Sequence, residues 1–195
     1  MAYIVSDTEL GFVDLYAVDP VGPGALKVSG SAIAYGRFNV PGNELRGYDT
    51  VLGGGTFVFA QAAATIAAGD MCELTTTNVN TNARYDISAK KWQGTAVKGK
   101  PLAAAMAALS SGQWGWFQIQ GIAVVNTSGT VAVDDAQYWQ ANGVISSTGV
   151  ASKQVLNAVA ASANNATYGT GSGAVTLSNQ SLIILNRPFG QGAIT

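Results

Sequence analysis

Short runs in which apolar and polar residues alternate, broken by glycine, proline and asparagine, fill most of the chain and predict strands. The clearest run is residues 113–125, in which Trp114 and Trp116 point to one face and Phe117 and Ile119 to the other. Because both faces carry large apolar groups, we expect this strand to be covered on both sides at one end. The pattern therefore predicts a mainly β fold with few or no helices.

Turn residues separate these runs. Asn142-Gly143 predicts a hairpin. The triplet Gly53-Gly54-Gly55 precedes a β-rich segment and no Lys-Ser/Thr pair, which favours a hairpin or bulge over a phosphate-binding loop. Residues 75–81 and 162–174 are small and polar, and we expect both to be loops. The alanine-rich run 101–109 could form a short helix, but its β-like flanks favour a strand.

Two kinds of boundary divide the chain. Residues 1–24 end in a Pro/Gly-rich hinge and are expected to form an extended N-terminal arm, with residues 25–195 as the β domain. Within that domain, the segment 65–74 resembles 130–139, and 100–108 resembles 153–161. This similarity would be explained by two related β subunits, about 50–125 and 126–187, or by one barrel built from two halves. Alternatively, β segments of similar composition merely look alike.

Charge is scarce. Only 11% of the residues are charged, against about 25% in an average protein, and the net charge is -1. We therefore expect no nucleic-acid partner and no attraction to anionic membranes. With 48% hydrophobic residues, much of the surface is expected to be covered by oligomer contacts or a docking partner. The alternative is a monomer whose surface is made of Ser, Thr, Asn and Gln.

The residues that most often carry chemistry are missing. The chain has no histidine and one cysteine, Cys72, so a Ser-His-Asp triad, a Cys-His pair and a structural zinc site cannot be built. Cys72 lies in a strand-like segment and is expected to be a small buried hydrophobic residue. We expect no cofactor, no metal and no small-molecule substrate.

Three groups of residues allow a functional alternative. An acid/base pair could be formed by Asp134 and Asp135, or by Asp70 with Glu73. Adjacent aspartates on a strand would point to opposite faces, however. Both pairs are more simply turn or solvent-facing residues. Lys90-Lys91-Trp92 could stack on a base, although two lysines are more often a solvated strand edge that blocks strand pairing. We therefore do not expect an enzyme.

The sequence shows neither a signal peptide nor a membrane span. Residues 1–20 contain four acids and no basic residue, which is unlike a signal peptide. No run of 18 apolar residues predicts a membrane span. We expect synthesis in the cytoplasm and no membrane association.

One succession of segments resembles a known family. A strand opens at Ala68-Gly69-Asp70, an alanine-rich run covers 102–109, and the sequence GQWGWFQIQG covers 112–121. Together with the continuation through 144–156, this order is similar to that of the capsid decoration (cement) proteins of tailed bacteriophages. The resemblance covers roughly residues 50–187, and residues 1–50 have no match.

The resemblance implies a β-barrel or β-tulip-like domain that binds the outer face of the capsid as a homotrimer. The major capsid protein would be its partner, and the virion surface its location after synthesis in the bacterial host. The expected subunit or capsid contacts are Tyr3, Ile4, Leu10, Phe12, Trp114 and Trp116. The alternative is a head-fibre or tail adhesion module that binds host glycans through Trp92, Trp114, Trp116 and Trp139.

Overall fold

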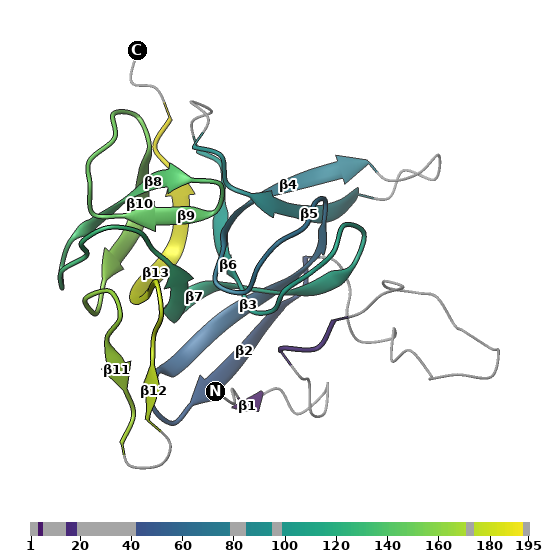
Figure 1. Cartoon of the computed structure of the whole chain (residues 1–195). Coiled ribbons are helices and arrows are strands. Elements are labelled where there is room, and N and C mark those ends of the chain that lie inside the picture. Colours follow the sequence, from purple (N-terminus) through teal and green to yellow (C-terminus); the bar gives the residue numbers. More distant parts are fainter. Residues whose placement is uncertain are drawn as a thin grey trace.

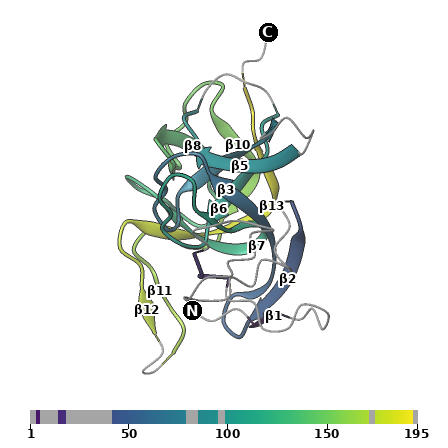
Figure 2. The ribbon, with the colours of Figure 1, turned by 90° about the vertical axis from the view of Figure 1, so that its right-hand side faces the viewer.

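The computed structural model describes residues 4–5, 15–18, 42–78, 85–94, 99–170 and 174–192. These residues form strands and connecting turns and contain no helix, so the mainly β prediction is confirmed (Figures 1 and 2). Most of the expected arm, residues 1–24, and the whole segment 25–41 lie outside the described part. The strands are β1 (Ile4–Val5), β2 (Glu44–Asp49), β3 (Gly53–Ala62), β4 (Met71–Asn78), β5 (Tyr85–Lys91), β6 (Leu102–Ala105), β7 (Trp114–Asn126), β8 (Ala136–Ala141), β9 (Val144–Ser146), β10 (Gln154–Ala160), β11 (Thr167–Tyr168), β12 (Val175–Thr176) and β13 (Gln180–Gly190).

Five strands close into a small barrel, here called ring 1. Strand β3 pairs in parallel with β5, β5 pairs with β4, β4 with β6, β6 with β7, and β7 again with β3. A closed ring of strands leaves no free edge, which is how small barrels avoid pairing with other chains. Strand β2 lies outside the ring, where it forms a hairpin with β3 and carries β1 on its far side.

The same order of pairings occurs a second time. In ring 2, β7 pairs with β13, β13 with β10, β10 with β8, and β8 with β9. A parallel bridge between Thr127, directly after β7, and Ile145 of β9 closes the ring. Each strand of ring 2 therefore has a counterpart in ring 1: β7, β8, β9, β10 and β13 correspond to β3, β4, β5, β6 and β7.

Strand β7 belongs to both rings. Its first half pairs with β3 and β6, and its second half pairs with β13, from Asn126 back to Gln120. The change of partner falls at Gly121, which has a φ of 96°. A Cβ atom there would lie 2.2 Å from the backbone oxygen of Gly54, so only glycine allows the two strands to approach this closely.

A repeated turn introduces the long strands. Before β4, β7, β8 and β13, a residue with positive φ precedes an Asp or Gln: Gly69-Asp70, Gly112-Gln113, Asp134-Asp135 and Asn179-Gln180. In three of these turns the Asp or Gln side chain accepts a hydrogen bond from the backbone N–H three residues earlier. The two segments that resemble each other in sequence, 65–74 and 130–139, thus lie at matching places in the two rings.

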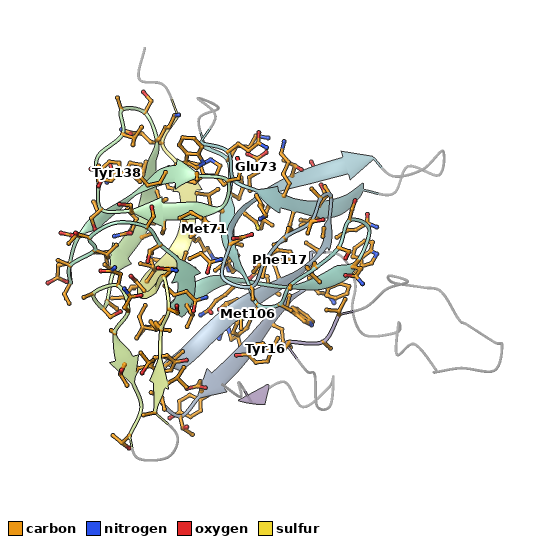
Figure 3. The ribbon with its side chains drawn as sticks, viewed as in Figure 1. Tyr16, Met71, Glu73, Met106, Phe117 and Tyr138 are labelled. Carbon is orange, nitrogen blue, oxygen red and sulfur yellow. The ribbon has the colours of Figure 1, made fainter. Side chains whose placement is uncertain are left out.

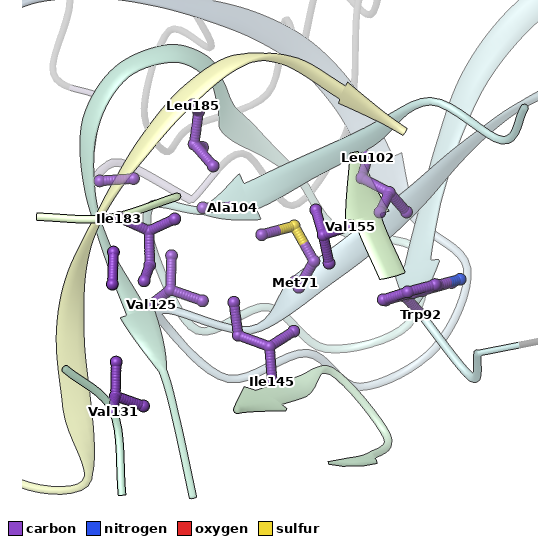
Figure 4. Packing of buried hydrophobic residues seen from close by; sticks show 12 residues of the cluster. Met71, Trp92, Leu102, Ala104, Val125, Val131, Ile145, Val155, Ile183 and Leu185 are labelled. Carbon is purple, nitrogen blue, oxygen red and sulfur yellow. The ribbon is translucent and has the colours of Figure 1, made fainter. Parts of the chain in front are cut away.

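Three clusters of apolar side chains fill the fold. The interior of ring 1 holds mainly small and medium residues of β3 to β7, including Cys72 and Phe117 (Figure 3). A second cluster lies between the rings and combines Met71, Trp92 and Leu102 of ring 1 with ring 2 residues such as Ile145 (Figure 4). The third cluster covers the outer face of β3, β7 and β13 and includes Leu15 and Leu177.

Several local predictions are tested by these elements. Strand β7, the hairpin at Gly143, the strand within 101–109 and the burial of Cys72 are confirmed. The expected loop 75–81 is wrong at its start, because β4 continues to Asn78. The expected loop 162–174 is interrupted by β11, which pairs with β12. The glycine triplet starts β3, and the turn before it is Thr50–Leu52.

Candidate interaction surfaces

Four of the six expected contact residues come from the arm. Tyr3, Leu10 and Phe12 lie outside the described residues. Ile4 lies in β1, and its backbone pairs with Tyr48 of β2. The structure therefore brings the start of the chain to the outer edge of β2, while the contact role of the arm stays a prediction.

The other two expected contact residues lie in the core. Trp114 and Trp116 are 5% and 2% exposed, and they belong to the cluster on the outer face of β3 and β7. Phe59 stacks on Trp114 with ring centroids 5.6 Å apart and makes a tilted contact with Trp116 at 5.2 Å. A single chain thus presents neither indole on its surface, and their conformation is fixed by packing within the chain.

The remaining tryptophans are also engaged. Trp92 is buried between the rings, and its backbone oxygen accepts a hydrogen bond from the indole of Trp139 at 3.0 Å. Trp139 is half-buried, and Lys153 Nζ lies 4.0 Å from the centre of its ring. Three of the four tryptophans proposed as a glycan platform are therefore inaccessible, and the fourth has a cation on its face.

Asp70 and Glu73 were expected to face solvent or a turn, and Lys90 and Lys91 to lie on a free edge. Both carboxylates are instead buried, and β5 pairs with β4 along its length. Lys91 Nζ lies 3.0 Å from Asp70 Oδ2, and Lys90 Nζ lies 3.0 Å from Glu73 Oε1. Antiparallel register places the opposite charges side by side, so the lysines neutralise the acids within the sheet.

Asp70 is also the point where the two rings meet. Its Oδ1 accepts a 2.8 Å hydrogen bond from the Asn126 side chain, and its Oδ2 accepts one from the Ala67 N–H. The backbone of Gly143, in the β8–β9 turn, packs against it so closely that a Cβ there would lie 3.0 Å from Asp70. Both oxygens of the Asp70 carboxylate thus have partners within the fold.

Asp134 and Asp135 lie in the turn before β8, which confirms their interpretation as turn residues. Asp134 adopts a φ of 67°. Hydrogen bonds from the Ser147 hydroxyl and the Ala132 N–H hold the pKa of Asp135 below its ordinary value. The carboxylate therefore stabilises the turn. Among the described residues, no group of three or more His, Cys, Asp or Glu side chains could hold a metal, and no helix could cross a membrane.

The thiol of Cys72 has low reactivity. Burial raises the pKa of its thiol well above the ordinary value, and the nearby carboxylate of Asp70 raises it further. A buried thiol with a raised pKa carries almost no thiolate at neutral pH, so it is a poor nucleophile. The prediction that Cys72 is a buried hydrophobic residue accords with this environment.

The described surface is hollowed in several places, of which we describe a pair. A groove of about 480 Å³ at one mouth of ring 1 is lined mainly by apolar residues such as Val58, Leu74 and Phe189. At its rim Arg187 makes a bidentate ion pair with Glu44, at 2.7 and 2.6 Å. A second, shallower groove of about 780 Å³ runs over Gly54, Gly55 and Gly121 and is edged by amide side chains. Neither contains a buried cluster of titratable groups.

Charge is distributed very unevenly along the fold. From Pro101 to Asn186, which spans β6 to β13 except its end, the charged residues are Asp134, Asp135 and Lys153. Residues 42–100, by contrast, carry eleven. Ring 2 therefore presents mainly uncharged groups to its surroundings, including exposed apolar side chains such as Val133 and Ile184. Such a surface binds through shape and neutral hydrogen bonds, with little contribution from long-range attraction.

The chain has few recognisable relatives. No protein-family model matches it, and no curated protein matches it. Among solved structures, it is similar to the N base of the head fibre protein gp8.5 of bacteriophage phi29. The two are 12% identical with a TM-score of 0.43, over 68% of this chain and 95% of that chain.

Proposed function

We propose that this chain is a structural protein of a bacteriophage virion that binds the outer surface of the capsid as a homotrimer and stabilises the shell as a decoration protein. The observation that carries the proposal is the almost uncharged surface of ring 2 on a closed, all-β body. The sequence resemblance of residues 50–187 to decoration proteins supports it independently. The chain acts as a homotrimer, binds the major capsid protein and catalyses no reaction.

The mechanism needs no chemistry. A protein that binds only the assembled shell stabilises that shell by linkage. The stabilising free energy grows with the logarithm of the ratio of protein concentration to Kd. Closed rings suit this role because they give a preorganised surface that loses little entropy on docking. A neutral surface makes the binding insensitive to salt, unlike attachment through charge.

The alternative is a head-fibre or tail module that binds host glycans through tryptophans. It has less support, because Trp92, Trp114 and Trp116 are buried in the chain. The two proposals differ in copy number, since a decoration protein covers the shell while a fibre or tail part is present in few copies.

Quantitative mass spectrometry of purified virions tests the proposal. We expect copies comparable in number to those of the major capsid protein. Purified protein added to capsids that lack it should bind, raise the temperature at which the shell opens, and remain bound in 1 M salt. A handful of copies per virion favours the fibre or tail module, and absence from the virion refutes both.

A further inference from the structure

One buried carboxylate brings together side chains from three distant parts of the chain. Asp70 lies directly before β4, and its side chain is only 3% exposed. Lys91, the last residue of β5, places Nζ 3.0 Å from Asp70 Oδ2. Asn126, the last residue of β7, donates a 2.8 Å hydrogen bond from Nδ2 to Asp70 Oδ1. The same carboxyl group therefore contacts a primary amine and a carboxamide.

The carboxamide of Asn126 is held in one orientation. Besides the bond to Asp70, its Nδ2 donates a 2.9 Å hydrogen bond to the backbone oxygen of Ala68. Its Oδ1 accepts a 2.9 Å hydrogen bond from the side chain of Gln180. Gly69 leaves room for this contact, because a Cβ there would lie 2.9 Å from Asn126 Oδ1. The donor at Oδ1 polarises the carbonyl bond and makes Cγ of Asn126 more electrophilic.

Gln180 departs from the repeated turn to which it belongs. The side chains of Asp70, Gln113 and Asp135, at the matching positions, each accept a hydrogen bond from the N–H three residues earlier. The side chain of Gln180 instead donates to Asn126. The turn before β13 thus supplies a donor at the oxygen on which negative charge develops when a nucleophile adds to a carboxamide.

Two comparable carboxylates lack one of these parts. Lys90 Nζ lies 3.0 Å from Oε1 of the buried Glu73, but Oε2 of Glu73 has no hydrogen-bond partner among the described residues, so no carboxamide adjoins it. Asp135, which matches Asp70 in ring 2, accepts a hydrogen bond from the hydroxyl of Ser147 in place of a lysine. Of these three carboxylates, that of Asp70 alone contacts both an amine and a carboxamide.

We propose that Lys91 and Asn126 form an intramolecular isopeptide bond between Nζ and Cγ, with Asp70 as the catalytic acid/base. The bond joins the end of β5 to the end of β7. Thr127, the next residue, carries the bridge to Ile145 that closes ring 2. A covalent bond at Asn126 therefore ties ring 1 to the point at which ring 2 closes. The single cysteine excludes a disulfide within the chain, so this link is of another kind.

The step balances without any further reactant. The Lys91 ammonium gives a proton to Asp70 Oδ2, and the freed electron pair on Nζ attacks Cγ of Asn126. The Cγ–Nδ2 bond then breaks. Two protons pass from Nζ to Nδ2 by way of the Asp70 carboxyl group, one at a time, and Nδ2 leaves as an ammonium ion. An ammonium and a carboxamide thus become a secondary amide and a free ammonium ion, with atoms and charge conserved.

The fold supplies the proximity that this reaction needs. Amines and carboxamides do not combine in dilute solution, and holding both on one acid/base group replaces a collision by an intramolecular step. The reaction occurs once in each molecule and turns over no substrate, so it is compatible with a structural role. The inference goes beyond the proposed function and does not depend on capsid binding.

The intact mass of the purified full-length chain tests the bond. The mass measured for each variant is compared with the mass calculated from its own sequence. We expect the wild type to be lighter by one ammonia molecule. A tryptic digest should contain a species in which the peptide of Lys91 is joined to the peptide of Asn126, without cleavage after Lys91.

Lys91→Arg and its matched control, Lys90→Arg, separate the bond from an ion pair. Arginine keeps a positive charge beside the carboxylate, but it does not deprotonate in proteins and is therefore no nucleophile. We expect Lys91→Arg to have its full sequence mass and Lys90→Arg to lose ammonia as the wild type does. Asp70→Asn keeps the size of the side chain but cannot accept the proton, and it should also have its full mass.

The wild-type mass decides the inference even if a variant fails to fold. A wild-type chain that is folded by circular dichroism and has its full sequence mass would overturn it. A loss of ammonia that persists in Lys91→Arg would also overturn it, because the loss would then arise elsewhere, for example from a succinimide at Asn142-Gly143.

Discussion

Ring 1 and ring 2 share an order of strand pairings but are stabilised differently. Ring 1 has its own interior cluster, and its outer face carries the ion pairs of Asp70 and Glu73. The inner residues of ring 2, including Ile145, pack against Met71, Trp92 and Leu102 from ring 1. Ring 2 thus uses the outside of ring 1 as part of its own core, which makes its stability dependent on ring 1.

The matching aspartates show how position changes the role of one residue. Asp70 and Asp135 each accept a hydrogen bond from the N–H three residues earlier, at 2.8 and 2.9 Å. Asp70 is buried because ring 2 packs over it, and it requires Lys91 for neutralisation. Asp135 lies at the surface of ring 2, where a serine hydroxyl suffices. The turn is set by local sequence, and the charge partner is set by the neighbouring ring.

The largest effect is expected where the rings share a strand. In Gly121→Ala, the new Cβ would lie 2.2 Å from the Gly54 oxygen at a φ of 96°. Strain and overpacking together should lower the free energy of unfolding by roughly 4 kcal/mol, measured by urea denaturation. Gly54→Ala is the control, because its Cβ meets no atom within 4 Å, and we expect a change within about 0.5 kcal/mol. Equal losses in the two variants would contradict the role given to Gly121.

The dependence of ring 2 on ring 1 can be tested with the single thiol. Ile145→Ala empties a buried position in the cluster between the rings and should cost about 3 kcal/mol. Cys72, inside ring 1, is shielded in the native state. If the rings unfold as one unit, labelling of Cys72 in urea should follow the loss of circular dichroism in both the wild type and the variant. Loss of β signal before Cys72 reacts would show that ring 2 unfolds alone.

A smaller loss is expected from the buried ion pair. Asp70→Ala leaves Lys91 without its carboxylate and removes the acceptor of the Asn126 and Ala67 hydrogen bonds. We expect a loss of roughly 2–3 kcal/mol in the free energy of unfolding. Asp135→Ala removes the matching bond from a surface turn and should have a clearly smaller effect. A loss as large in Asp135→Ala would mean that the turn bond, rather than the ion pair, stabilises ring 1.

The sequence predicts the mainly β class of the fold better than it predicts how the strands pair into closed rings. Alternation and turn residues indicate β7 and the hairpin at Gly143, because both signals are local. The pairing of Lys90 with Glu73 depends on strand register, which a single sequence leaves open. Glu73 was therefore wrongly expected to face solvent, whereas Lys90 is exposed as expected. The recurrence of a positive-φ residue followed by Asp or Gln is a signal of the two rings that pattern reasoning missed.

The contact residues illustrate the same limit. Trp114 and Trp116 lie on one face of β7, where apolar residues surround them. The sequence pattern predicts that such a face is covered, but it does not say whether the same chain or another chain covers it. The homotrimer, the capsid partner and the division at about 50–125 and 126–187 stay predictions. The predicted boundary at residues 125 and 126 falls at the end of β7, and this strand belongs to both rings.

The smallest effect is expected from the ion pair between β13 and β2. Arg187 of β13 and Glu44 of β2 are both well exposed, so solvent screening limits their contribution to at most about 1 kcal/mol. The hydrogen bond from Arg187 lowers the pKa of Glu44 below its ordinary value of 4.5. Its stabilisation is therefore complete above about pH 4.5 and is lost as the pH falls through the lowered pKa. A double-mutant cycle of Glu44→Gln and Arg187→Gln measures the coupling free energy of the pair. We expect a coupling at pH 7 that vanishes near pH 2 and weakens in 1 M salt. A coupling unaffected by pH would show that packing, not charge, joins the two strands.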